Sequence, residues 1–220
     1  MIILVACGGG STNLNLTEAD TIGAMSFKME AWADNWFAVY LEEELIVEDS
    51  VSITTERSFN AESVTFNGDY PLHLNFILKD FKENDTGLEY IGERNQQMGD
   101  GGFIMQLTDT NTGDVVAVSD DSFTCTVLHN APLDKSCESE SNPVAGTEPC
   151  TFENLSEPDG WKLADFDDSA WTATTIHTSA DVSPKMGYDN ISWDSSAQFI
   201  WGPDLETNNT VLCRVTVSAQ

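Results

Sequence analysis

The chain has 220 residues, of which 40% are hydrophobic and 10% aromatic, so it is long enough and apolar enough to fill a hydrophobic core. Nine Lys and Arg residues against 37 Asp and Glu residues give a net charge of −28. This charge repels phosphate backbones and anionic lipid surfaces, which argues against nucleic acid as a partner and leaves a membrane accessible only through a lipid anchor. The acidic surface either serves solubility or collects divalent cations.

The N-terminal residues 1–7 end in Leu4-Val5-Ala6-Cys7, which resembles a bacterial lipobox. In a lipobox the signal peptide is cut before the cysteine, and the thiol is acylated. Residues 8–20 begin Gly-Gly-Gly-Ser and predict a flexible tether, although a buried N-terminal strand is the alternative for this end of the chain. We therefore expect an exported protein with a lipid on Cys7, either at a bacterial cell surface or as an outer-membrane lipoprotein.

Strand patterns dominate the region 21–133, which we assign to the main β-sandwich. Apolar residues alternate with other residues in 27–31 and 72–78, and again near the C-terminus in 211–217, as expected for strands with one face on a core. Shorter strand-like runs cover residues 36–41, 45–47, 63–66, 103–107, 115–118 and 123–127. About ten or more short strands separated by turn residues predict an all-β fold, a sandwich or jelly roll.

The segment 94–103 is rich in side-chain amides and contains three glycines. The glycines allow the backbone to approach a neighbouring group closely. The candidate ligand-binding residues are Arg94, Asn95, Gln96 and Gln97, which could form hydrogen bonds with sugar hydroxyls. The alternative is a loop that bonds to itself and braces one end of the sandwich.

The segment 109–114 contains Asp109, Asn111 and Asp114 and at first sight resembles a calcium loop. An EF-type loop, however, needs glycine at its sixth position, and here Gly113 is the fifth. Strand-like runs flank the segment, so a hairpin turn is the favoured interpretation. Calcium at these three residues remains the weaker alternative, and no other cofactor is expected.

Four cysteines remain once Cys7 is set aside, and an even number in an exported chain predicts two disulfides. These are Cys125, Cys137, Cys150 and Cys213. Of the three possible pairings, we expect Cys137–Cys150 to close the polar segment 134–160 as a stapled loop. The other two cysteines lie in strand-like runs and would then pair across the core. Residues 161–220 follow as a C-terminal β segment that completes the sandwich or packs on it.

Two stretches of the chain carry longer motifs. Residues 33–46 read ADNWFAVYLEEELI, while residues 160–171 read GWKLADFDDSAW and are followed by AQFIW at 197–201. Both resemble motifs of the galactose-binding-like β-sandwiches of secreted proteins, and the first has acidic residues in place of the usual Asn-Gly turn. The two motifs also stand in the reverse of their usual order. The resemblance therefore implies either one jelly-roll sandwich with permuted halves or two packed sub-domains.

That superfamily includes sugar binders, protein binders and domains that brace an enzyme, so fold alone does not supply a function. Among six tryptophans, Trp193 lies in the most loop-like context and is the candidate aromatic platform for a sugar. We expect a non-enzymatic cell-surface module that binds a glycan or a surface protein. The alternatives are a self-assembling structural subunit of the cell envelope or an extracellular filament, and a secreted glycoside hydrolase that uses two distant carboxylates.

Overall fold

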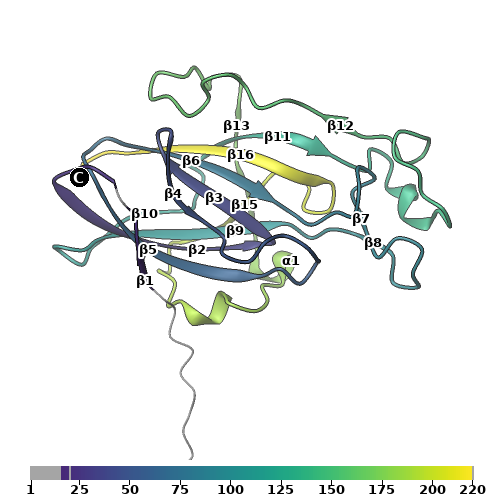
Figure 1. Cartoon of the computed structure of the whole chain (residues 1–220), viewed down its shortest axis with the longest axis horizontal. Coiled ribbons are helices and arrows are strands. Elements are labelled where there is room, and N and C mark those ends of the chain that lie inside the picture. The colour runs from purple at the N-terminus through teal and green to yellow at the C-terminus, as the bar shows by residue number, and fades with distance from the viewer. Residues whose placement is uncertain (1–15, 20, 220) are drawn as a thin grey trace, which may run out of the picture.

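The computed structural model describes residues 16–19 and 21–219, and they form an all-β sandwich of two packed sheets (Figure 1). The predicted fold class is therefore confirmed. The lipobox, including Cys7, and most of the expected tether lie outside the described residues.

The first sheet has seven strands in the order β1 (Leu16–Glu18), β5 (Asn60–Gly68), β2 (Met25–Asp34), β9 (Gly102–Asp109), β15 (Phe199–Trp201) and β14 (Thr175–His177), with β10 (Val115–Val118) also paired to β9. The second sheet has the order β12 (Glu153–Asn154), β11 (Thr124–Asn130), β16 (Asn208–Val217), β6 (Leu72–Lys79), β3 (Trp36–Leu41) and β4 (Glu44–Glu48), with β13 (Thr172–Ala173) paired to β11.

Three short helices and a small hairpin complete the secondary structure of the described residues. They are η1 (Lys135–Ser139), α1 (Ser179–Val182), η2 (Tyr188–Asn190) and the pair β7 (Leu88–Glu89) and β8 (Gln97–Met98). The β7–β8 hairpin lies at the right-hand end of the sandwich in Figure 1. This end carries the candidate site described below.

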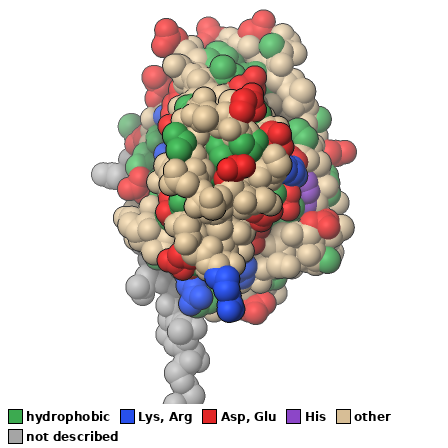
Figure 2. Space-filling model, turned by 90° about the vertical axis from the view of Figure 1, so that its right-hand side faces the viewer, with side chains coloured by type: hydrophobic (Ala, Val, Ile, Leu, Met, Phe, Trp, Pro, Cys, Tyr) green, Lys and Arg blue, Asp and Glu red, His purple; other side chains and the backbone are tan. Residues whose placement is uncertain are grey.

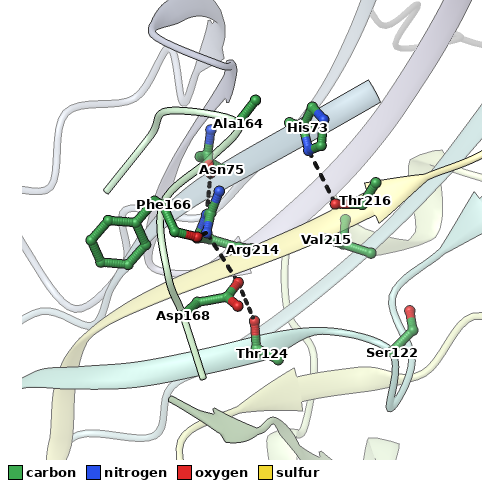
Figure 3. A pocket seen from close by; sticks show the side chains of 10 residues that line it. All are labelled: His73, Asn75, Ser122, Thr124, Ala164, Phe166, Asp168, Arg214, Val215 and Thr216. Atoms are coloured by element: carbon green, nitrogen blue, oxygen red, sulfur yellow. Dashed lines mark hydrogen bonds and ion pairs between the residues drawn. The ribbon is translucent and has the colours of Figure 1, made fainter. Parts of the chain in front are cut away.

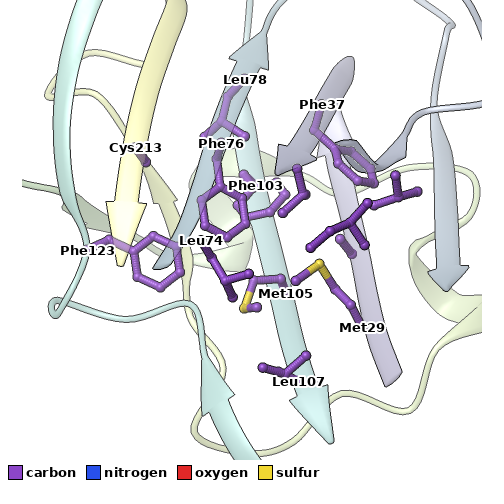
Figure 4. Packing of buried hydrophobic residues seen from close by; sticks show 14 of the residues in the cluster. Met29, Phe37, Leu74, Phe76, Leu78, Phe103, Met105, Leu107, Phe123 and Cys213 are labelled. Atoms are coloured by element: carbon purple, nitrogen blue, oxygen red, sulfur yellow. The ribbon is translucent and has the colours of Figure 1, made fainter. Parts of the chain in front are cut away.

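The core fills the space between the sheets and follows the predicted alternation (Figure 4). In β6, Leu72, Leu74, Phe76 and Leu78 are all fully buried, because every second side chain of a strand points to the same face. The Phe76 ring meets that of Phe103 from the opposite sheet, with ring centroids 5.5 Å apart. The two sheets therefore share one apolar interior.

Both expected disulfides are present. Cys137–Cys150 closes the stapled loop, which packs on Leu88 of β7. From sequence we expected Cys125–Cys213 to cross the core, but it does not. The two residues lie directly opposite each other on the neighbouring strands β11 and β16, so the bond runs within one sheet.

The C-terminal segment 161–220 supplies strands to both sheets. It contributes β14 and β15 to the first sheet and β13 and β16 to the second, where β16 lies between β6 and β11. The buried Arg214 on β16 fastens the beginning of this segment to the outer face of the second sheet.

Candidate functional site

Three aspartates meet at the end of the sandwich that carries the β7–β8 hairpin. Asp34 is the last residue of β2, Asp80 directly follows β6, and Asp100 precedes β9. The ends of β2 and β6 are held together because the backbone N–H of Asn35 donates to the carbonyl of Lys79 at 2.9 Å. Both sheets and the loop before β9 therefore contribute to one group, which we call the carboxylate cluster.

The carboxylate cluster is compact and mostly buried. One carboxylate oxygen from each of its members lies within 4.8 Å of the others. Asp34 is 0% exposed and Asp80 is 3% exposed. Among the described residues, no group donates a hydrogen bond to any of the four carboxylate oxygens of these two residues. Burial of a charged group without such partners is costly, so this arrangement calls for a compensating ligand or proton.

One ammonium group partly balances the cluster. Lys185 Nζ lies 2.7 Å from Asp100 Oδ2 and 3.5 Å from Asp34 Oδ2, and its side chain is 41% exposed. A fourth carboxyl group, that of the buried Glu89, accepts a hydrogen bond from Gln97 Nε2 at 2.8 Å. Four carboxyl groups therefore lie around a single ammonium group at this place.

Burial changes the acidity of these groups. It raises the pKa of Asp34 to about 8, with a further contribution from the charge of Asp100 and an opposing one from Lys185. Burial also raises the pKa of Asp80 well above its ordinary value, and the nearby Asp34 adds to this effect. The pKa of Glu89 rises to about 7, again mainly through burial. The cluster therefore has a strong demand for positive charge, which protons or a cation can meet.

The glycines of the loop before β9 fit against other parts of the protein. A Cβ atom at Gly99 would lie 1.6 Å from Asp80 Oδ2, and one at Gly101 would lie 2.3 Å from the Trp201 ring. We expected these glycines to allow close approach to a neighbouring group, and the neighbouring groups are side chains of the protein, those of Asp80 and Trp201. Gly99 thus forms part of the wall around the carboxylate cluster.

The four polar residues predicted as ligand contacts in this loop have different surroundings. Arg94 and Asn95 are exposed, while the Gln96 amide donates to the carbonyls of Glu138 and Glu140, both at 2.8 Å. Gln96 therefore braces the loop against the disulfide-closed segment, whereas Gln97 lines a surface hollow.

That hollow has a volume of about 600 Å³ and lies beside the carboxylate cluster. We call it the acidic hollow. It is lined by Gln97, Met98, Gly99, Asp100, Glu138, His177, Asp181, Pro203, Asp204, Leu205 and Glu206. Figure 2 shows this end of the molecule, where acidic side chains surround small groups of hydrophobic ones. The hollow is therefore lined by carboxylate and amide groups together with the apolar side chains of Met98, Pro203 and Leu205.

Trp193 lines a second hollow, of about 530 Å³, which we call the aromatic hollow. Its ring stacks on Tyr188 with centroids 5.6 Å apart, and its Nε1–H donates to the Tyr188 carbonyl at 3.1 Å. His177 lines both the aromatic and the acidic hollow. The structure thus places Gln97 and Trp193 in adjoining hollows rather than in one.

The weaker calcium candidates lie at the opposite end of β9, in the turn that leads to β10. Asp109 Oδ1 accepts hydrogen bonds from the backbone N–H groups of Asn111 at 2.7 Å and Thr112 at 3.4 Å. Gly113 has a φ of +80°, which a tight turn uses readily. The favoured hairpin is therefore present, and backbone N–H groups of the turn donate hydrogen bonds to Asp109 Oδ1.

A third hollow, on the outer face of the second sheet, is organised around Arg214 (Figure 3). Its guanidinium donates to Asn75 Oδ1 at 3.0 Å, to Asp168 Oδ2 at 3.0 Å, and to the carbonyls of Phe166 at 3.1 Å and Leu163 at 2.7 Å. Four hydrogen bonds within the protein leave this arginine with a structural role. It holds the stretch that carries the FDDSAW motif onto β16.

Sequence reasoning missed the carboxylate cluster as a unit. Asp34 and Asp100 lie inside the two segments that attracted attention, 33–46 and 94–103, but their own carboxylates were not singled out. Asp80 was missed altogether. The available signal was that Asp34 and Asp80 each stand at the end of a strongly apolar strand, where a buried polar group is unusual.

No protein-family model, curated protein or solved structure matched the chain. Among the described residues, no helix is both long enough and apolar enough to pass through a bilayer.

Proposed function

We propose that the protein is an exported, non-enzymatic module that binds a glycan at the acidic hollow and the adjoining aromatic hollow. The observation that carries this proposal is that His177 lines both hollows, so hydrogen-bonding groups on one side adjoin an aromatic side chain on the other. A sugar offers hydroxyl groups to the first and a flat apolar face to the second.

The charge of the site narrows the class of glycan. Asp100, Asp181 and Glu206 line the acidic hollow, in a protein of net charge −28. Carboxylates accept hydrogen bonds from sugar hydroxyls but repel sulfate and uronate groups. We therefore expect a neutral or amine-bearing oligosaccharide rather than an acidic one.

Export is supported by the two disulfides, which form and persist in oxidising compartments. The lipid on Cys7 and the position at a bacterial surface remain part of the proposal. So does the galactose-binding-like family, for which the sandwich architecture is suitable but not specific.

The proposal is tested with an array of neutral, amine-bearing and acidic oligosaccharides, followed by titration of the best ligand. We expect Trp193→Leu and Gln97→Ala to weaken binding at least about tenfold, equivalent to about 1.4 kcal/mol. The matched control is Trp171→Leu, which alters another half-buried tryptophan that packs on Phe166, away from both hollows. Denaturant melts of all three variants establish that they remain folded.

An array without neutral or amine-bearing ligands, or equal affinities for wild type and Trp193→Leu, would contradict the proposal. Ordered assemblies in light scattering, together with an empty array, would instead favour the structural subunit. Release of reducing sugar that disappears on substitution of a hollow carboxylate would favour the glycoside hydrolase.

A further inference from the structure

The carboxylate cluster differs from an ordinary acidic patch because two of its members are buried. Exposed acidic groups face water and need no other partner. Asp80 is 3% exposed, and both of its carboxylate oxygens lack a hydrogen-bond donor among the described residues. The ion pairs of Lys185 within the described chain are with Asp34 and Asp100, not with Asp80. An unpartnered carboxylate therefore points into the cluster from the end of β6.

We infer that Asp34, Asp80 and Asp100 bind a calcium ion. This inference rests on the geometry of the cluster and is independent of the proposed glycan site. The three side chains supply only oxygen ligands, which are the ligands that hard divalent cations prefer. The ion would link the end of β2, the end of β6 and the loop before β9.

The spacing of the oxygens suits calcium. Calcium binds oxygen at about 2.3–2.6 Å, so two of its ligands can be up to about 5 Å apart. One oxygen from each aspartate lies within 4.8 Å of the others, inside this limit. Calcium also accepts irregular ligand sets, whereas magnesium demands a near-ideal octahedron. We therefore assign the site to calcium and use magnesium as the comparison ion.

Two neighbours define how the ion would be held. Gly99 lies so close to Asp80 that any larger residue would collide with the carboxylate. Lys185 approaches from the solvent side with a 41% exposed side chain, so its ammonium can leave when a cation arrives. Since Gly99 and Asp100 also line the acidic hollow, calcium would fix the shape of one of its walls.

The test uses thermal melts of the full chain after removal of metals with EDTA. Wild type is compared in EDTA, in millimolar CaCl2, in millimolar MgCl2 and in NaCl of matched ionic strength. We expect calcium to raise the melting temperature by on the order of 5 °C above matched NaCl, and magnesium to raise it less.

The decisive variant is Asp80→Asn, which keeps the size of the side chain and removes its charge. In EDTA this variant should melt at or above the wild-type temperature, because it no longer buries an unpaired carboxylate. In calcium it should melt below wild type, because a ligand is missing. The order of the two proteins therefore reverses between the two conditions, and a variant that merely folds poorly cannot produce this reversal.

The matched control is Asp114→Asn, which removes one exposed acidic charge from the β9–β10 turn and should retain the full calcium response. Trp193→Leu should also retain it, so failure of the glycan proposal leaves this test intact. A wild-type response to calcium no greater than that to matched NaCl would overturn the inference. So would an undiminished calcium response in Asp80→Asn, or its loss in Asp114→Asn.

Discussion

A buried aspartate lies near each end of β9, Asp109 at its last residue and Asp80 beside the loop that precedes it, and the comparison between them separates a turn from a candidate site. At the β10 end, Asp109 is 6% exposed, and backbone amides of the turn donate to its carboxylate. At the other end, Asp80 is 3% exposed and has no such donor among the described residues. Both ends combine acidic residues with glycine in sequence, so residue type alone does not distinguish them. What distinguishes them is whether the carboxylate oxygens accept hydrogen bonds from the protein.

At a fixed pH, the largest effect should come from Gly101, in the loop before β9. In Gly101→Ala the new Cβ would lie 2.3 Å from the Trp201 ring, which is fully buried and donates its Nε1–H to the Asn208 carbonyl. We expect a loss of about 3 kcal/mol in the free energy of unfolding, measured by urea denaturation in EDTA.

Gly113→Ala, at the turn, is the matched comparison. It has open space around it, so only its positive φ opposes a side chain, at about 1 kcal/mol. Similar losses in the two variants would show that the loop before β9 adjusts more easily than the described packing allows.

Asp49 provides an intermediate case and a pH test. Its Oδ1 accepts a hydrogen bond from the Val51 N–H at 2.8 Å, whereas its Oδ2 has no donor among the described residues. Burial raises its pKa to about 7, and the charge of Glu62 adds to the shift. The folded protein therefore retains this proton between about pH 4 and pH 7, where the unfolded chain loses it, so this residue makes stability fall as pH rises through that window.

Asp49→Asn should lack this contribution. The stability of the variant relative to wild type should increase by about 4 kcal/mol between pH 4 and pH 8, measured by urea denaturation at each pH. A difference between the two proteins that stays constant with pH would show that the Asp49 carboxylate is ionised in the fold.

The smallest effect should appear at Asp109. In Asp109→Ala the amides of the turn lose their acceptor, at a cost of about 1 kcal/mol, while Asp109→Asn keeps Oδ1 and should be close to neutral. Because the amides of the turn already donate to Asp109, the stability changes of both variants should be the same in EDTA and in calcium. A dependence on calcium would return the turn to the candidate metal sites.

The strands of the core could be predicted from sequence because their information is local. The runs 36–41 and 115–118 match β3 and β10, and the apolar positions of 72–78 face the core as expected. The short strands β7, β8, β12 and β13 were missed, since two-residue strands carry no alternation and form only where distant segments meet.

The site could be predicted less well, because the groups that form it are far apart in the sequence. Gln96 was expected to face a ligand, yet its partners are carbonyls 42 and 44 residues further along the chain. Asp34, Asp80 and Asp100 are each separated by at least 20 residues, and only the meeting of the two sheets brings them together. Sequence could indicate the loop but not which of its groups were already occupied.

The disulfides have a consequence for cleavage of the chain by proteases. Cys125 and Cys213 are 88 residues apart, and the Cys137–Cys150 loop is nested inside the circle that they close. A single cut in the segment between α1 and β15, where Lys185 and Met186 are exposed, would leave both pieces covalently joined. The strand β16 would remain tied to β11, in the middle of its sheet. A chain nicked at this surface would thus keep its architecture until a reductant reaches the Cys125–Cys213 bond.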